Sequence, residues 1–124
     1  HVVPGDELGQ FGDHIRFCVK GTEEPDVIPE LAEFVTGDNV VPKNRYSGFF
    51  NTDLAQRMES INPDKVIICG VCTDICVMHT TSDARNRDYT VEVPRDCVAS
   101  FDARQHAWAL DHMEKILGAR ITNR

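Results

Sequence analysis

The sequence predicts an α/β fold: a parallel, Rossmann-like sheet in a three-layer α/β/α arrangement. Three observations support this. Strand-like and helix-like segments alternate between residues 66 and 121, which is the pattern of βαβ units. The run Val66-Ile67-Ile68 is continuously apolar, as in strands that are buried on both faces of a parallel sheet. The segments between strands carry apolar residues at helical spacing. We therefore expect right-handed crossovers, with helices on both faces of the sheet.

The first half of the chain is expected to be less regular. Residues 1–30 are rich in Gly, Pro and acidic residues and predict irregular structure, followed by a short helix over residues 29–34. Residues 39–42 are predicted to form a strand. Thr52-Asp53 offers an N-cap for a helix that continues to Ile61, and Asn62-Pro63 ends that helix.

The second half supplies the regular elements. Residues 66–69 predict a strand, residues 74–87 a helix and residues 89–93 a second strand. A helix is expected over residues 102–117, with Gly118 ending it and a short strand at residues 119–121. Its predicted apolar stripe is Ala107, Leu110, Met113, Ile116 and Leu117. Ligands of such sheets bind beyond the carboxyl ends of the strands, where residues 42–43 and 70–76 both fall.

Composition narrows the class of protein. The chain has 124 residues, of which 41% are hydrophobic and 27% charged, enough for a single domain with its own core. Its net charge is −7 and its basic residues are scattered, so neither nucleic acid nor an anionic membrane is an expected partner. The sequence shows no apolar run of membrane-spanning length and no signal peptide. These features favour the cytoplasm.

The chain has five cysteines, Cys18, Cys69, Cys72, Cys76 and Cys97. An odd number without a secretion signal predicts reduced thiols rather than a disulfide framework. Cys69-x-x-Cys72 allows a redox pair or a zinc site as an alternative, but no second Cys or His pair stands at zinc-finger spacing. Because Cys69 ends the apolar run, it is predicted to be a small buried hydrophobe.

Cys76 is the candidate nucleophile. It follows an apolar strand and the Gly70 turn, in the first turn of the predicted helix. Unpaired N–H groups and the positive end of the helix dipole favour a thiolate at such a position. The alternative is that Cys76 is a core residue, as cysteines in apolar helices usually are.

Several ordered motifs support the catalytic interpretation. They occupy residues 43–50, 52–54, 70–77, 83–84 and 96–100. In this order they resemble the isochorismatase-like cysteine hydrolases, most closely the nicotinamidases and pyrazinamidases. The resemblance runs from Gly21 to Ile121. It implies hydrolysis of a small, nicotinamide-like carboxamide to the acid and ammonia through a cysteine thioester.

The resemblance also implies roles for single residues. Cys76 and Lys43 fall on the family's catalytic Cys and Lys, and a poor electrophile such as a carboxamide needs an activated nucleophile with fixed oxyanion donors. Lys43 would favour the Cys76 thiolate electrostatically. The backbone N–H groups of Cys72 and Cys76 would bind the oxyanion, and a cis peptide is expected between Val71 and Cys72. Family members that act on isochorismate generally lack this cysteine, so Cys76 favours amide chemistry.

The family's third catalytic residue has no counterpart before Lys43. In the family an Asp lies near the start of the first strand of a six-stranded sheet in the order 3-2-1-4-5-6. We therefore expect residues 1–124 to be a partial domain, the C-terminal two thirds, without the first two strands. Asp74 is an alternative carboxylate, although its position favours helix capping.

A metal ion is also implied by the resemblance. Related nicotinamidases bind zinc or another divalent ion beside the substrate ring, and His1, Glu7 and His14 are spaced plausibly for that loop. The family usually places a His directly before its Cys-Val-x-Gly-Thr segment, where this chain has Phe17. No organic cofactor is expected.

The remaining side chains allow both structural and functional interpretations. Tyr46 and Phe49 are candidates for the substrate pocket, and core packing is an equal alternative for Phe49. His79 is expected to point along its helix toward packing, and His106 and His112 are expected to be exposed. Trp108 is a candidate for the interface of the homo-oligomer that the resemblance implies.

Three other functions remain open. The chain could be a metal-free amidohydrolase acting on a carbamoyl or other amide compound. It could be a non-catalytic family member or fragment with a scaffold role, for which the missing Asp is the argument. A redox protein using Cys69 and Cys72 is the fourth interpretation.

The expected gap in the sheet leads to a prediction about the isolated chain. Without two central strands, backbone groups would be left unpaired on both sides of the gap. We expect residues 1–124 alone neither to unfold cooperatively nor to hydrolyse nicotinamide. Urea denaturation followed by circular dichroism and an amidase assay test this. A cooperative and active 124-residue chain would refute it.

Overall fold

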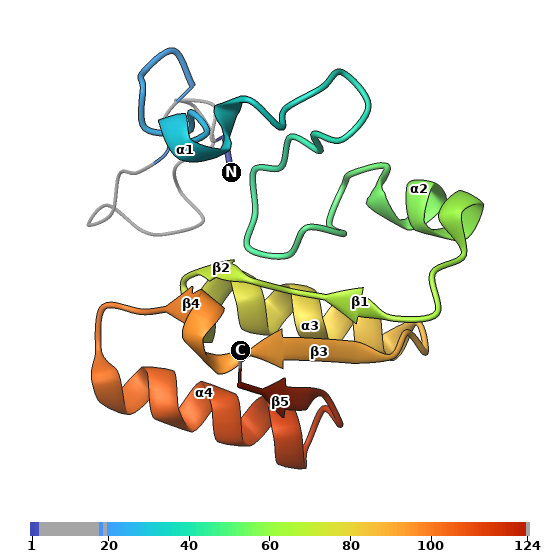
Figure 1. Cartoon of the computed structure of the whole chain (residues 1–124), viewed down its shortest axis with the longest axis vertical. Helices are drawn as coiled ribbons and strands as arrows, with labels where there is room; N and C mark the ends of the chain where they lie inside the picture. The colour runs from blue at the N-terminus through green and yellow to red at the C-terminus, as the bar shows by residue number, and fades with distance from the viewer. Residues whose placement is uncertain (3–17, 19, 124) are drawn as a thin grey trace. The chain divides into compact units, whose positions relative to one another are not determined.

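The structure, a computed structural model, describes residues 1, 2, 18 and 20–123. The chain divides into two compact units, His1–Arg45 and Tyr46–Arg124, and Figure 1 follows the elements of each along the chain. The described part of the first unit contains one helix, α1 (Pro29–Ala32), which begins with a proline at the position predicted. The rest of this described part consists of turns and loops.

The predicted strand at residues 39–42 is wrong. These residues belong to no sheet in the structure. A strand requires a repeated ladder of backbone hydrogen bonds with a neighbour, and no described ladder includes them. The apolar character of residues 39–42 alone is therefore not enough to predict a strand.

The second unit is built on parallel strands, as predicted. β1 (Val66–Ile67), β3 (Val91–Pro94) and β5 (Arg120–Thr122) form a three-stranded sheet in the order β1-β3-β5. β2 (Gly70–Val71) pairs in parallel with β4 (Val98–Ala99), with Gly70 opposite Val98. Of the predicted strand at residues 66–69, only residues 66–67 form a strand, β1. β2 begins after that range, at Gly70, and belongs to a different pairing (Figure 1).

The second unit contains five helical elements among its described residues. They are α2 (Leu54–Ile61), the π-helical turn η2 (Thr73–Val77), α3 (Met78–Asn86), the 3₁₀ turn η3 (Arg95–Cys97) and α4 (Ala103–Lys115).

The predicted ends of α2 and α4 are confirmed to within two residues, although the Asp53 side chain makes no capping bond at the start of α2. Asp102 caps α4, because its carboxylate accepts hydrogen bonds from the N–H groups of Arg104 and Gln105. Asn62 ends α2 in the left-handed conformation, with φ 50°. Gly118 has φ 69°, a conformation that glycine adopts readily, so the chain can leave α4 and enter β5.

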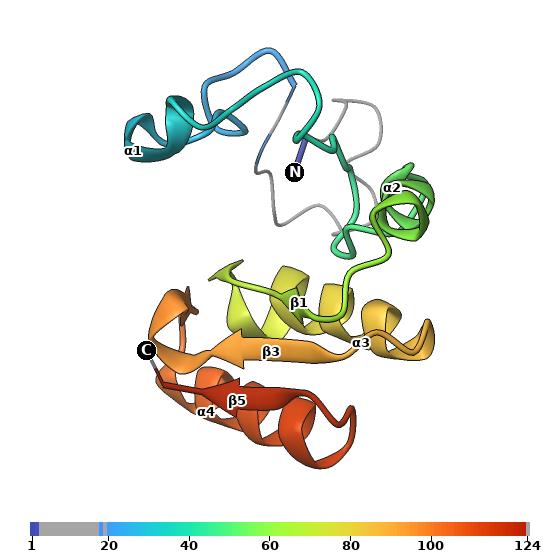
Figure 2. The same ribbon diagram turned by 45° about the vertical axis from the view of Figure 1, so that its right-hand side comes forward.

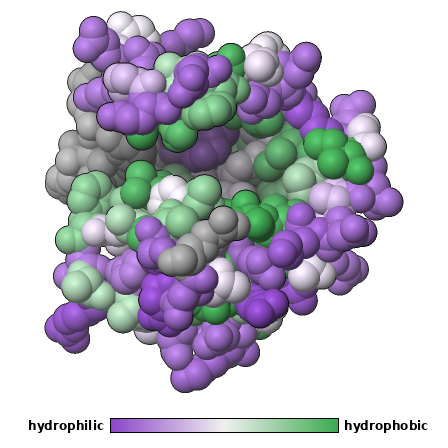
Figure 3. Space-filling model, viewed as in Figure 1, coloured by the Kyte–Doolittle hydropathy of each residue, from purple (hydrophilic) through white to green (hydrophobic). Residues whose placement is uncertain are grey.

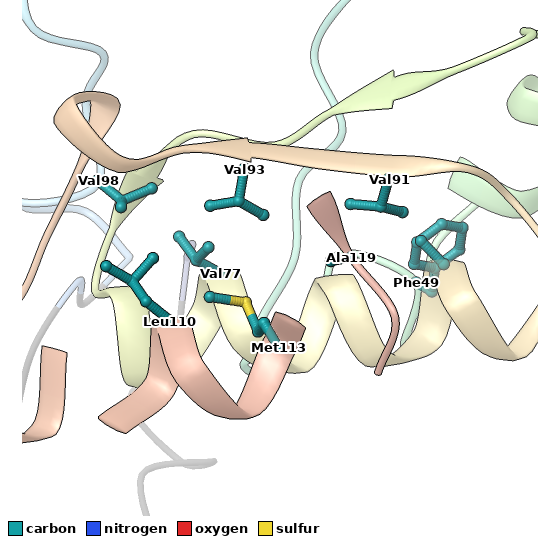
Figure 4. Packing of buried hydrophobic residues seen from close by; sticks show 9 residues of the cluster. Phe49, Val77, Val91, Val93, Val98, Leu110, Met113 and Ala119 are labelled. Atoms are coloured by element: carbon teal, nitrogen blue, oxygen red, sulfur yellow. The ribbon is translucent and has the colours of Figure 1, made fainter. Parts of the chain in front are cut away.

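Both crossover helices lie on one face of the β1-β3-β5 sheet. Figure 2 shows α3 and α4 behind the strands, and Figure 4 shows both on the same side of β3. These two helices therefore supply one of the two helical layers of the predicted α/β/α arrangement. From β1 to β3 and from β3 to β5 the chain moves across the sheet in the same direction. Two crossovers of the same hand then place their helices on the same side of the sheet.

The core lies between β3 and the two helices. Val91 and Val93 of β3 point toward Val77, Leu110 and Met113 (Figure 4).

The predicted apolar stripe of α4 is partly wrong. Leu110 and Met113 are buried, but Ile116 is 69% exposed and Ala109, which was not predicted, is fully buried. The face that meets α3 and β3 is therefore narrower than the apolar spacing indicated.

Cys69 is exposed, which contradicts its predicted burial. β1 is an edge strand of the described sheet, and α3 and α4 cover only one face of that sheet (Figure 2). Ile67 on β1 is accordingly 44% exposed. An apolar run predicts a buried strand only where neighbours cover both of its faces.

Hydrophilic side chains cover much of the face seen in Figure 3, and apolar side chains reach the surface between them. Trp108 is 52% exposed and stacks on His112, with ring centroids 4.9 Å apart. Its predicted role in an oligomer stays a prediction. No helix among the described residues has the length and apolar character needed to cross a membrane.

The core analysis predicts a stability difference between two α4 residues. Replacing Met113, which is fully buried, with Ala should lower the free energy of unfolding by about 2–5 kcal/mol through lost burial and a cavity. Ile116→Ala is the matched control on the exposed face and should change it by less than about 0.5 kcal/mol. Urea denaturation of the complete gene product measures both, and equal effects would contradict this assignment of the core.

Candidate active site

The turn that carries Cys76 has a defined backbone geometry. The peptide bond between Val71 and Cys72 is cis, at the position that the family resemblance predicts. The Cys72 carbonyl accepts hydrogen bonds from the N–H groups of Ile75 (3.1 Å) and Val77 (3.2 Å). The second of these bonds makes η2 a π-helical turn, which the sequence did not predict. α3 continues directly from η2, so Cys76 lies near the start of a continuous helical segment, as expected.

Cys72 directly precedes η2, the turn that contains Cys76. Burial raises the pKa of the Cys72 thiol, and the negative charges of Asp74 and Cys76 raise it further, while a hydrogen bond with Ser100 partly lowers it. A raised pKa keeps a thiol protonated and poorly nucleophilic. The surroundings of Cys72 therefore favour its neutral form.

Two side-chain pairs hold η2 against the segment that leads into α4. The Thr73 hydroxyl lies 2.8 Å from His106 Nδ1, and the Ser100 hydroxyl donates to the Asp74 carboxylate. Two predictions are corrected here. His106 is half-buried rather than exposed, because its ring faces η2, and Asp74 makes no capping bond, because η2 already begins at Thr73.

Tyr46 and His79 lie near Cys76. Burial raises the pKa of the Tyr46 hydroxyl, and the negative charge of Cys76 raises it further. The Tyr46 and His79 rings are tilted by 43°, with centroids 5.5 Å apart. His79 is exposed rather than packed, and its Nδ1 lies 2.7 Å from the Ile75 carbonyl oxygen. Tyr46, Cys76 and His79 are thus grouped at the start of the helix.

The residues that follow Tyr46 are anchored to α3. The Ser47 hydroxyl donates to the Asp83 carboxylate, and the Gly48 N–H donates to the Thr80 hydroxyl at 3.0 Å. Phe49 is only 6% exposed and belongs to the core, with the Arg87 guanidinium 4.5 Å from its ring centroid. Of the two interpretations of Phe49, the structure shows core packing. The contacts of residues 47–49 with α3 restrict the position of Tyr46, which precedes them.

Lys43 belongs to the first unit, whereas Cys76 belongs to the second. The Lys43 ammonium group lies 2.9 Å from His1 Nδ1 and donates to the Arg45 carbonyl oxygen at 2.8 Å. An ammonium held by two acceptors has a restricted position, which suits a fixed electrostatic role.

The proposed metal ligands are only partly described. Glu7 and His14 lie outside the described residues. His1 Nδ1 is engaged with Lys43, and its Nε2 is buried. Within the described part of the chain, no group of three or more His, Cys, Asp or Glu side chains is arranged to hold a metal. The described residues therefore do not assemble the site, and no chemical step is assigned to a metal.

A hollow of about 440 Å³ in the second unit is lined by residues 62–64 and 87–90, among others. These residues precede β1 and β3, so the hollow lies at the end of the sheet opposite to Cys76. Ligands of open parallel sheets bind at the carboxyl ends of the strands. We therefore regard the turn at Cys76, and not this hollow, as the candidate site.

Comparison with known proteins gives a consistent family. The model of the isochorismatase domain matches residues 7–124. The isochorismatase family protein PncA of Bacillus subtilis is 38% identical over 94% of this chain, and the chain spans 69% of that protein. The chain spans only 53% and 54% of two further relatives.

Solved structures agree with these matches. The crystal structure of nicotinamidase PncA from Bacillus subtilis superposes with a TM-score of 0.87, at 29% identity over 98% of this chain and 71% of that one. N-carbamoylsarcosine amidase from Thermoplasma acidophilum superposes with a TM-score of 0.84, at 30% identity over 98% of this chain and 68% of that one. Both likenesses extend over almost the whole chain.

The pKa of Cys72 leads to a prediction about reactivity. Because burial raises it above the ordinary value of 9.0, alkylation of Cys72 by iodoacetamide should have its midpoint above pH 9.0. Cys76→Ser removes a neighbouring charge and should lower that midpoint without removing the larger effect of burial. Mass spectrometry of the labelled peptides at a series of pH values measures both profiles. A Cys72 midpoint at or below pH 9.0 would contradict the structure.

Proposed function

We propose that this chain, since it belongs to the isochorismatase domain family, carries the nucleophile of a hydrolase that cleaves a small, nicotinamide-like carboxamide to the acid and ammonia. The observation that carries the proposal is the position of Cys76, near the start of a helical segment that follows the Val71–Cys72 cis peptide. The similarity to a protein described as a nicotinamidase supports the class of substrate.

The first step is attack by the Cys76 thiolate on the amide carbonyl carbon. A new C–S bond forms, and the carbonyl π electrons move to oxygen as the tetrahedral intermediate develops. The positive end of the helical segment favours the thiolate before attack. The Lys43 ammonium acts in the same direction in this proposal, by electrostatic attraction.

The oxyanion needs donors that are fixed before the reaction. Backbone N–H groups of Cys72 and Cys76 are proposed for this role, because rigid donors aimed at developing charge lower the barrier most effectively. Collapse of the intermediate breaks the C–N bond, and the nitrogen leaves as ammonia after it takes up one proton, equivalent to the proton that the Cys76 thiol lost when it ionised. Water then attacks the thioester, which releases the carboxylic acid and restores the Cys76 thiol.

Cys76 is favoured over Cys72 as the nucleophile by their surroundings. The raised pKa of Cys72 disfavours its thiolate, so the thiol beside the nucleophile does not compete for the substrate. Tyr46 is proposed to border the substrate, because it lies close to Cys76. His1, Glu7 and His14 stay the residues predicted to hold a divalent ion, and no step of the proposed reaction depends on such an ion.

A carbamoyl compound is the second candidate substrate. The superposition on N-carbamoylsarcosine amidase supports it, and the chemistry is the same attack on an amide carbonyl with loss of ammonia. A pyridine ring and a carbamoyl group differ in size and in hydrogen bonding. A comparison of kcat/KM for nicotinamide and for an N-carbamoyl amino acid therefore distinguishes the two candidates.

Replacement of the nucleophile tests the proposal directly. In the complete gene product, Cys76→Ser should lower kcat for nicotinamide by at least about a thousandfold, because a serine hydroxyl lacks an ionised form at neutral pH. Cys97→Ser, which changes an exposed thiol, is the matched control and should retain activity. Mass spectrometry after rapid acid quenching should detect the acyl-enzyme mass on the Cys76 peptide.

The alternatives give different results. Full activity of the Cys76→Ser variant would exclude Cys76 as the nucleophile. A complete gene product that hydrolyses neither substrate, while remaining folded, would favour the non-catalytic scaffold instead.

A further inference from the structure

We propose that His106 is a positioning residue for this hydrolysis, acting through Thr73 on the turn that carries the oxyanion donors. The inference rests on the proposed function, since it assigns a role to η2 in the same reaction. It adds a residue from α4, an element to which neither the motifs nor the comparisons assign a role.

The first observation is the burial of Thr73. Its side chain is fully buried, and its hydroxyl lies 2.8 Å from His106 Nδ1. A buried hydroxyl without a partner costs about 1–3 kcal/mol, so this bond stabilises one conformation of the turn. Thr73 directly follows Cys72 and shares η2 with Cys76, so its position constrains both proposed oxyanion donors.

The second observation is that His106 itself is held in place. The backbone N–H of His106 donates to the Asp102 carbonyl oxygen at 2.9 Å. The Asp102 carboxylate caps the same turn by accepting from the N–H groups of Arg104 and Gln105 at 2.8 and 2.9 Å. The imidazole therefore projects from a capped first turn and provides a fixed partner for Thr73.

The third observation is that the chain leading to His106 follows η2 closely. β4 pairs with β2 in register, Val71 opposite Ala99. Ser100 then donates to Asp74, and His106 contacts Thr73. The pairing of β4 with β2 and the two side-chain hydrogen bonds thus connect residues 98–106 to β2 and to η2.

This arrangement has a specific kinetic consequence. Oxyanion donors act through their position, and a displacement on the order of 1 Å costs about a hundredfold in rate. Loss of the Thr73–His106 bond should therefore weaken binding of the tetrahedral state more than binding of the substrate. Alkylation of Cys76 by iodoacetamide needs the thiolate but no oxyanion donor, so its rate should not change.

The test uses the complete gene product with three substitutions at the bond: His106→Ala, His106→Asn and Thr73→Val. Asparagine keeps an amide near the place of the imidazole Nδ1, so it is the rescue variant. His112→Ala is the matched control, because His112 is a half-buried histidine of the same helix that stacks on Trp108. Melting temperatures are measured first, and all kinetics are recorded well below the lowest of them.

His106→Ala and Thr73→Val are expected to lower kcat for nicotinamide by about ten- to a hundredfold, with KM within about threefold of the wild type. Affinity for pyridine-3-carboxaldehyde, which forms a tetrahedral adduct with the thiolate, should fall by a similar factor. The Cys76 alkylation rate should stay within about twofold, since it reports only the thiolate. His106→Asn should recover most of the loss, and His112→Ala should show none.

The inference is overturned if the aldehyde binds His106→Ala and the wild type equally, or if His112→Ala produces the same loss. It is also overturned if alkylation of Cys76 slows in parallel with kcat, since the effect would then act on the thiolate. A wild type that binds the aldehyde at Cys76 but hydrolyses no amide would refute the proposed function alone. Absence of aldehyde binding by the folded wild type would overturn both.

Discussion

The packing of β3 against two helices is the constraint on which the rest of the second unit depends. β3 pairs with a strand on each side, and Val91 and Val93 are buried beneath α3 and α4. A central strand that is paired on both edges and covered by packed side chains has little freedom to shift. The helices that pack on it are therefore fixed too, and one of them, α3, extends from the turn that carries Cys76.

The chemistry of the turn follows from this fixed support. η2 begins where β2 ends, so Cys76 is placed beyond the carboxyl ends of the parallel strands, where such sheets bind ligands. The polar groups around Cys76 differ in burial and in hydrogen bonding. Cys72 is kept neutral, whereas Thr73 and Asp74 are occupied by partners from the segment before and within α4.

The regular elements of the second unit could be predicted from the sequence because their signals are local. Asp102 caps α4 and Gly118 ends it, and the apolar run at Val66 marks a strand. Local sequence signals do not show, however, which elements become neighbours in the fold. The strand predicted at residues 39–42 failed because a strand needs a partner along its length, and Cys69 is exposed because nothing in its own sequence shows which face of the sheet is covered.

The candidate site was predictable to a similar extent. The cis peptide was predicted from the resemblance of one continuous motif, and the structure contains that peptide at the expected bond. The role of Cys76, in the same motif, stays a prediction. His106 was missed because its partner lies 33 positions away in the sequence. A histidine on a charged helix carries no local signal of such a contact. The only sequence clue was Thr73, a polar residue beside buried apolar ones, which needs a hydrogen-bond partner wherever it is buried.

This difference between local and distant signals bears on how the site is maintained. The motif around Cys76 supplies the proposed nucleophile, but the position of its backbone depends on residues 98–106, which fold against it through β4, Ser100 and His106. Packing of α4 on β3 through Leu110 and Met113 holds that segment in turn. A chain of contacts therefore connects the core, through α4, His106 and Thr73, to the proposed oxyanion donors. A substitution that lets α4 shift acts on η2 through Thr73, even when the substituted residue lies far from Cys76.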